Sequence, residues 1–144
     1  MARYVAARPD RFVGAAFVTP HYPEEAVKEL ERAFDQLGTK FLKIYADYFG
    51  KPNDDPAYFP IYEFLDDRGL AVMSHSTFPF DPEGTTQLKR YTALSERFPR
   101  VKWVFAHAGG AGSKRLHGAI EAVRALPSVY LETATSESEG GAFE

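Results

Sequence analysis

Two histidines occupy equivalent places in the chain, because each directly closes a short apolar run. His75 closes the run GLAVMSH at residues 69–75, and His107 closes VKWVFAH at residues 101–107. Imidazole is the commonest side-chain ligand for zinc-type metals and the usual general acid or base near neutral pH. The pair therefore predicts a metal site or an acid–base centre, provided that the fold brings the two rings together.

The apolar runs that end in these histidines belong to a regular series. Runs typical of strands start near residues 12, 40, 70, 101 and 129, and the stretches between them have helical spacing. A repeat of roughly 30 residues matches one strand–helix unit. Short buried strands that alternate with helices predict an α/β fold with a parallel sheet, which presents its functional groups at the carboxyl ends of the strands. The two histidines should therefore lie side by side.

Period-two alternation assigns side chains to the two faces of each strand. It predicts three groups that each share a face: Ala71, Met73 and His75; Val101, Trp103, Phe105 and His107; and Phe41, Lys43 and Tyr45. Neighbouring strands lie about 4.8 Å apart, so we expect the His75 and His107 rings within about 8 Å of each other. We also expect Lys43 at the same rim, with Leu42 and Ile44 turned toward the helices.

Several other polar residues are candidates for the same rim. Lys43 lies within an apolar strand, where an ammonium is costly unless it meets a charge, a metal site or water, although its stem can also reach solvent. His21 follows the first strand in a TPHYP turn, and Glu132 lies near the end of the last strand, where it lines the rim or forms an ion pair at the edge. His117 falls on a polar helix face and is predicted to be a surface residue. A single histidine at a strand end is more often a hydrogen-bonded structural residue, and it is the matching positions of His75 and His107 that favour a function.

A glycine-rich segment at residues 109–112 offers a rival interpretation. Such a loop before a helix can present backbone N–H groups to a phosphate, and Glu132 follows at the distance where a dinucleotide fold places an acid. However, the third glycine of the dinucleotide motif would fall at Arg115, and the segment around Gly112 does not match the GxxxxGK(S/T) phosphate-binding loop of nucleoside triphosphatases. These departures disfavour phosphate or dinucleotide binding.

The composition limits the classes of protein further. The chain has 144 residues, a net charge of −3 and no cysteine. This length predicts a single domain over residues 1–144, with a frayed polar tail at 134–144. The charge and the lack of a basic cluster argue against nucleic acid as a partner. No apolar run reaches the roughly 20 residues of a membrane span, so we expect a cytoplasmic protein that binds no membrane.

A set of short motifs, in this order, resembles the amidohydrolase superfamily. The motifs are RPDRFVG (8–14), PEEAVKEL (23–30), FLKIY (41–45), NDDPAY (53–58), LAVMSH (70–75), FPRVK (98–102), FAHAGG (105–110) and PSVYL (127–131). The branch that the chain resembles contains amino-carboxymuconate-semialdehyde decarboxylase. The resemblance covers nearly the whole chain.

The resemblance implies a (β/α)₈ barrel of the TIM type with one divalent metal, commonly zinc. His75 would correspond to the metal ligand on the fifth strand, and His107 to the histidine on the sixth strand that acts as general base or acid. Lys43 would lie on the fourth strand and face the site. The implied activity is metal-dependent hydrolysis, or non-oxidative decarboxylation, of a small organic substrate, in which the metal activates water or acts as a Lewis acid.

The chain departs from the family pattern in its metal ligands. It has no His-x-His motif, and it lacks the aspartate ligand that the family carries on the eighth strand. About five strand–helix units are present, so we expect a partial barrel, the central portion of a hydrolase, with half a metal site and little activity of its own. Open sheet edges predict a homo-oligomer. The alternative is a non-enzymatic half-barrel that serves as a binding or assembly module.

Overall fold

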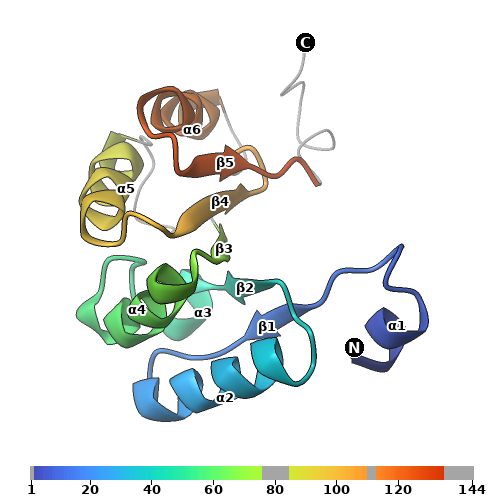
Figure 1. The fold of residues 1–144 in the computed structure, drawn as a ribbon. Helices are drawn as coiled ribbons and strands as arrows, with labels where there is room; N and C mark the ends of the chain where they lie inside the picture. The colour runs from blue at the N-terminus through green and yellow to red at the C-terminus, as the bar shows by residue number, and fades with distance from the viewer. Residues whose placement is uncertain (1, 76–84, 110–112, 135–144) are drawn as a thin grey trace.

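The computed structural model describes residues 2–75, 85–109 and 113–134, and its centre is one parallel sheet (Figure 1). The strands follow one another across the sheet in chain order, and every neighbouring pair is parallel. They are β1 (Ala15–Phe17), β2 (Phe41–Ile44), β3 (Ala71–His75), β4 (Lys102–Ala106) and β5 (Val129–Leu131). The predicted α/β class and the parallel order are therefore confirmed.

The helices that connect the strands lie along one side of the sheet (Figure 1). These are α2 (Pro23–Asp35), α4 (Phe59–Arg68), α5 (Thr85–Arg97) and α6 (Ser113–Ala125). α1 (Ala2–Ala7) lies apart from them near β1, and the short helices α3 (Ala46–Phe49) and η1 (Pro56–Tyr58) follow β2. No helix among the described residues is both long and apolar enough to cross a bilayer.

Local sequence explains where the long helices begin and end. α2 starts at a proline and carries Glu24 and Glu25 in its first turn, where carboxylates interact favourably with the helix dipole. α4 ends at Gly69, which adopts φ +62°, a left-handed conformation that glycine reaches at little cost. β3 starts within a few residues of the end of α4, and β4 within a few residues of the end of α5, so the loops that lead from these helices into the strands are short.

The core lies between the sheet and the helices. Leu42 and Ile44 of β2 and Val72 of β3 are fully buried there, together with Trp103 and Phe105 of β4. The burial of Leu42 and Ile44 confirms the predicted register of β2. The other face of the sheet, which carries Lys43 and His75 at partly buried positions, is therefore the face available for chemistry.

Two elements differ from the sequence-based expectation. The first strand was predicted over residues 12–19, but β1 comprises three residues, because it pairs with β2 alone and has no second neighbour among the described residues to extend it. The segment 47–55, predicted as a loop, begins with α3, which ends at Gly50 in the left-handed conformation (φ +63°). The predicted loop 76–84 and all of the predicted tail beyond Ala134 lie outside the described residues.

Candidate active site

The carboxyl ends of β3 and β4 bring His75 and His107 together. Their ring centroids are 5.1 Å apart, and the ring planes cross at 80°. This separation confirms the predicted proximity of the two rings. Two imidazoles at adjacent strand ends form the start of a metal site or a proton-transfer pair.

His107 reaches this position by a route that simple alternation does not predict. Trp103 and Phe105 face the helices, where the Trp103 ring packs 4.9 Å from that of Tyr62, so the predicted shared face of these residues with His107 is wrong. β4 ends at Ala106, and His107 follows with φ +118°. This positive φ interrupts the alternation, and the imidazole turns back to the side of His75. Positive φ is costly outside glycine and is typical of functional sites.

The backbone after β5 holds the His107 ring in one orientation. His107 Nδ1 lies 2.9 Å from the carbonyl oxygen of Ala134 and 3.5 Å from Glu132 Oε2. A carbonyl oxygen only accepts hydrogen bonds, so Nδ1 carries the proton and Nε2 is the nitrogen that can take up a proton or bind a metal. The other carboxylate oxygen of Glu132 accepts a hydrogen bond from the Ala134 N–H, which fixes Glu132 beside the ring.

His75 has a drier environment than an ordinary surface histidine. Its Nδ1 is buried and has no hydrogen-bond partner in the described part of the chain. Burial lowers the pKa of His75, and the nearby charges of Lys43 and His107 lower it further, whereas Asp47 opposes them. The Tyr45 ring lies 4.8 Å from the His75 ring. His75 is therefore held as a neutral imidazole, which is the form that binds metals.

Lys43 lies on the same face of the sheet as His75, at the level of Met73, two residues before His75. Its partners in the register are Phe17 of β1 and Met73 of β3. Its Nζ atom is 4.8 Å from the centroid of the Tyr45 ring. Burial lowers the pKa of the Lys43 ammonium, while the carboxylates of Glu132 and Asp47 act in the opposite direction. Lys43 and Glu132 thus share the electrostatic environment of the histidine pair.

The two remaining histidines take separate positions. His21 Nε2 lies 3.0 Å from the carbonyl oxygen of Phe49, and the His21 ring packs edge-on to the Phe49 ring at 6.1 Å. This exposed contact places His21 at the junction of β1 and α3, so its role in lining the site stays a prediction. His117 is exposed on α6, as predicted.

Sequence reasoning missed residues that follow β2. Asp47, in the first turn of α3, acts on the charges of both His75 and Lys43, and Tyr45 contacts both side chains through its ring. Tyr45 could have been identified from its place two residues after Lys43, where alternation puts it on the same face. Asp47 could not, because the helix that turns it toward the site was predicted as loop.

A buried polar network beneath His75 was also missed. Asn53 Nδ2 donates to Ser74 Oγ at 2.6 Å and to Tyr91 Oη at 2.8 Å, and Tyr62 Oη donates to the Asn53 carbonyl at 2.9 Å. Burial raises the pKa of Tyr91 to about 12, so its hydroxyl stays neutral. The network joins the segment after α3 to the strand residue that precedes His75.

The described residues fit a divalent metal only in part. They contain no group of three or more His, Asp or Glu side chains that could hold a metal ion. His75, with its unpartnered Nδ1, and the adjacent His107 can contribute two nitrogen ligands. A catalytic zinc site needs three protein ligands, so the described residues supply part of such a site.

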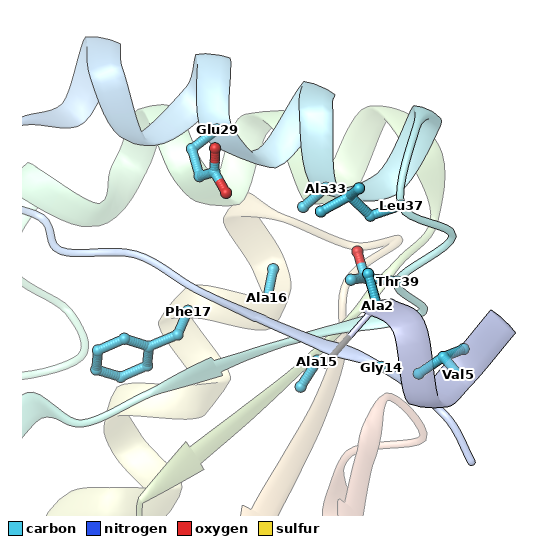
Figure 2. A pocket seen from close by; sticks show the side chains of 10 residues that line it. All are labelled: Ala2, Val5, Gly14, Ala15, Ala16, Phe17, Glu29, Ala33, Leu37 and Thr39. Atoms are coloured by element: carbon cyan, nitrogen blue, oxygen red, sulfur yellow. The ribbon is translucent and has the colours of Figure 1, made fainter. Parts of the chain in front are cut away.

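A separate hollow lies away from the histidine pair. Figure 2 shows it between α1, the start of β1 and the end of α2. Its volume is about 120 Å³. Its lining is mainly apolar, and its one carboxylate, Glu29, is already paired with Arg32 at 2.7 Å. This hollow therefore lacks the chemical groups of an active site.

Comparison with known proteins assigns the family. Residues 1–142 match the amidohydrolase family. The chain belongs to this family. A curated amidohydrolase relative is the 2-amino-3-carboxymuconate-6-semialdehyde decarboxylase of Dictyostelium discoideum, which is 30% identical over 132 residues, covering 77% of this chain and 36% of that protein.

Solved structures of other proteins confirm the TIM-barrel fold. An uncharacterised TIM-barrel protein from Bordetella bronchiseptica has a TM-score of 0.72 at 22% identity, over 90% of this chain and 46% of that one. The 5-carboxyvanillate decarboxylase of Sphingomonas paucimobilis has a TM-score of 0.67 at 22% identity, over 99% and 62%. The 4-oxalomesaconate hydratase of Rhodopseudomonas palustris has a TM-score of 0.67 at 24% identity, over 92% and 47%.

The amidohydrolase chain thus spans about a third to three fifths of the length of these relatives. Its five parallel strands correspond to part of an eight-stranded barrel. The relatives with a stated activity are enzymes, and amidohydrolases usually depend on a metal. The predicted family and TIM-type fold are confirmed, and these relatives offer no support for the alternative of a non-enzymatic module.

Proposed function

We propose that this chain carries part of the active site of a metal-dependent enzyme that decarboxylates a small organic acid, with zinc as the metal. The observation that carries the proposal is the 5.1 Å pair of His75 and His107 at the carboxyl ends of adjacent parallel strands. In TIM barrels this rim is where the catalytic groups gather. Hydrolysis of a small substrate by the same residues is the broader activity of the family.

The two histidines take different roles in this proposal. His75 is the metal ligand, because it is neutral and its buried Nδ1 has no partner among the described residues. A bound divalent metal would supply Lewis-acid polarisation of the substrate. His107 is the acid–base group, because Ala134 and Glu132 engage the Nδ1 side of its ring and so leave Nε2 for proton transfer to the substrate.

In decarboxylation, the role of His107 is to donate a proton. The bond between the carboxylate carbon and its neighbour breaks, CO₂ leaves, and the electron pair remains on the neighbouring carbon. A protonated His107 delivers its Nε2 proton to that carbon, and Glu132 stabilises the imidazolium before the transfer. Decarboxylation is favoured over hydrolysis because the Dictyostelium relative is a decarboxylase that shares 30% identity with the chain.

The proposal is tested on the protein that contains this chain, together with any sequence that flanks it. We expect bound zinc by elemental analysis, and CO₂ release from members of a panel of aromatic and conjugated acids. His75→Ala should remove most of the metal and the activity, whereas the matched surface change His117→Ala should alter neither. A protein that releases CO₂ at the same rate after chelation and with His75→Ala would contradict the proposal.

A further inference from the structure

The Lys43 ammonium is buried without a counter-ion in direct contact. Its Nζ has no hydrogen-bond partner, and it forms no ion pair within 4.0 Å of a carboxylate of residues 2–75, 85–109 and 113–134. Glu132 and Asp47 act on it only at longer range, and the Glu132 carboxylate is already engaged by His107 and by the Ala134 N–H. A buried cation that has lost water and gained no acceptor is unstable, so Lys43 has an unfilled requirement for an anion.

The position of Lys43 shows where such an anion would lie. The Tyr45 ring lies 4.8 Å from the Lys43 Nζ atom and 4.8 Å from the centre of the His75 ring, and the charge of Lys43 acts on the pKa of His75. An anion on Lys43 would therefore lie near the histidine pair. The stem of a lysine has four rotatable bonds, so Nζ can turn toward a ligand without movement of the backbone.

Aromatic rings lie beside Lys43. Tyr45 and Tyr48 are stacked with centroids 4.9 Å apart and planes at 7°, and Phe17 packs edge-on to Tyr45 at 5.9 Å. Tyr48 and Phe17 are 79% and 54% exposed, so their rings are accessible. Aromatic surfaces favour flat, apolar partners. An ammonium beside such a wall suits a ligand that is both planar and anionic.

We propose that Lys43 anchors a carboxylate of the substrate, and that the Tyr45–Tyr48 wall selects an acid whose carbon skeleton is aromatic or conjugated. This inference rests on the proposed function only in that it treats the bound acid as the substrate. Binding of an acid at Lys43 does not itself require turnover. Lys43 is thus a specificity-determining residue, distinct from the metal ligand His75 and the proton-transferring His107.

Binding of a simple planar acid to the metal-free chain tests the inference. Benzoate and its neutral counterpart benzamide are titrated into the chelator-treated, isotope-labelled chain, and the dissociation constants are measured from amide chemical shifts. We expect benzoate to bind, with shifts centred on residues 43–48, and benzamide to bind at least about tenfold more weakly, because a charge-assisted hydrogen bond is lost.

Variants of Lys43 assign the effect to its charge. Lys43→Met should weaken benzoate binding at least about tenfold, whereas Lys43→Arg should retain it within a few-fold. Lys40→Met, which removes an exposed lysine just before the same strand, serves as the matched control and should change nothing. Circular dichroism checks the fold of each variant, and Lys43→Gln replaces Lys43→Met should the latter unfold.

Three results would overturn the inference: no binding of benzoate, equal binding of benzamide, or undiminished binding by folded Lys43→Met or Lys43→Gln. None of them bears on the metal or on turnover. Conversely, a chain that binds benzoate through Lys43 but whose parent protein holds no metal and releases no CO₂ would contradict the proposed function and leave the anion site standing.

Discussion

At the scale of single residues, the main feature is that the neighbouring imidazoles of His75 and His107 have different environments. Ala134 and Glu132 hold His107 from one side by polar contacts. His75 is half-buried, its Nδ1 has no partner among the residues that the structure describes, and the Tyr45 ring packs against it. Environments that differ in this way separate the roles of paired titratable groups. This difference supports the proposal that His75 binds a metal and His107 transfers a proton.

The protonation of His75 provides the first prediction. Because burial lowers its pKa, we expect the His75 ring of the metal-free chain to titrate below 6.5 in a proton NMR experiment. The unfolded chain then binds the proton first as the pH falls. The stabilising contribution of neutral His75 is therefore complete above pH 6.5 and declines as the pH falls below that value.

Unfolding by urea between pH 5 and 7 measures this contribution. The free energy of unfolding should decrease toward pH 5 more steeply for the natural chain than for His75→Gln, which cannot titrate. A midpoint for His75 at or above 6.5 would show that the ring is not desolvated in solution.

The second prediction compares the losses of kcat caused by substitutions of His107 and of Glu132. His107→Asn should lower kcat by about 10²–10⁴-fold, since it removes the proton donor. Glu132→Gln keeps the size of the side chain but removes the charge beside the ring, and should lower kcat by about 10–100-fold. Steady-state kinetics on the protein that contains this chain compares them, and a larger loss for Glu132→Gln would reverse the assigned roles.

At the scale of elements, the segment after β2 is fixed to the strand that carries His75. The Asn53 side chain bridges Ser74 and Tyr91, and Ser74 Oγ also donates to the His75 carbonyl at 3.2 Å. These contacts join residues that are 21 and 38 positions apart in the chain. The network therefore positions α3 and its Asp47 relative to the rim.

Removal of Asn53 is the third prediction. Asn53→Ala leaves two buried hydroxyl groups with fewer partners, so we expect a loss of about 2 kcal/mol in the free energy of unfolding, measured with urea. Glu63→Ala, on the exposed face of α4, is the control and should change stability by less than about 0.5 kcal/mol. Equal effects of the two changes would mean that the network adds nothing to stability.

The end of α4 gives the fourth prediction. Gly69 has φ +62°, and a Cβ atom added there would meet only atoms of Arg100, at 4.0 Å. The cost of Gly69→Ala is therefore backbone strain alone, and we expect a loss of about 1–2 kcal/mol in stability. Gly69→Asn should cost less, because asparagine tolerates the left-handed conformation. Thermal unfolding compares the two variants, and an unchanged midpoint for Gly69→Ala would exclude strain at this turn.

At the scale of the whole molecule, the sheet formed by the described residues has two open edges. β1 and β5 each pair with a single neighbour in the described part of the chain. Around β1, Phe12, Val13 and Phe17 are 53%, 61% and 54% exposed. Exposed apolar side chains beside a free strand edge invite pairing with another strand.

Association through the β1 edge is the fifth prediction. We expect the isolated chain to form dimers or larger assemblies in light-scattering experiments, and Phe17→Lys to shift it toward the monomer, since a charge disfavours edge pairing. Tyr130→Lys, on the opposite edge strand β5, tests whether that edge is used instead. A natural chain that is monomeric at every concentration would show that neither edge associates.

The sequence by itself determined the order of the strands and which face of β2 packs against the helices. It also determined that two histidines lie at the carboxyl ends of neighbouring strands. These features depend on local patterns: apolar periodicity, a proline that starts α2 and a glycine that ends α4. Such signals act over a few residues and can be read along the chain. The same patterns placed Lys43 on the face of His75.

Only the tertiary structure decided how the site is assembled. The φ of +118° at His107 breaks the alternation that the sequence implies, and it is supported by contacts with Glu132 and Ala134, which lie more than twenty residues away. The same holds for the bridge from Asn53 to Tyr91. A backbone conformation that is unfavourable by itself exists only where distant contacts stabilise it, so no local pattern in the sequence could reveal it.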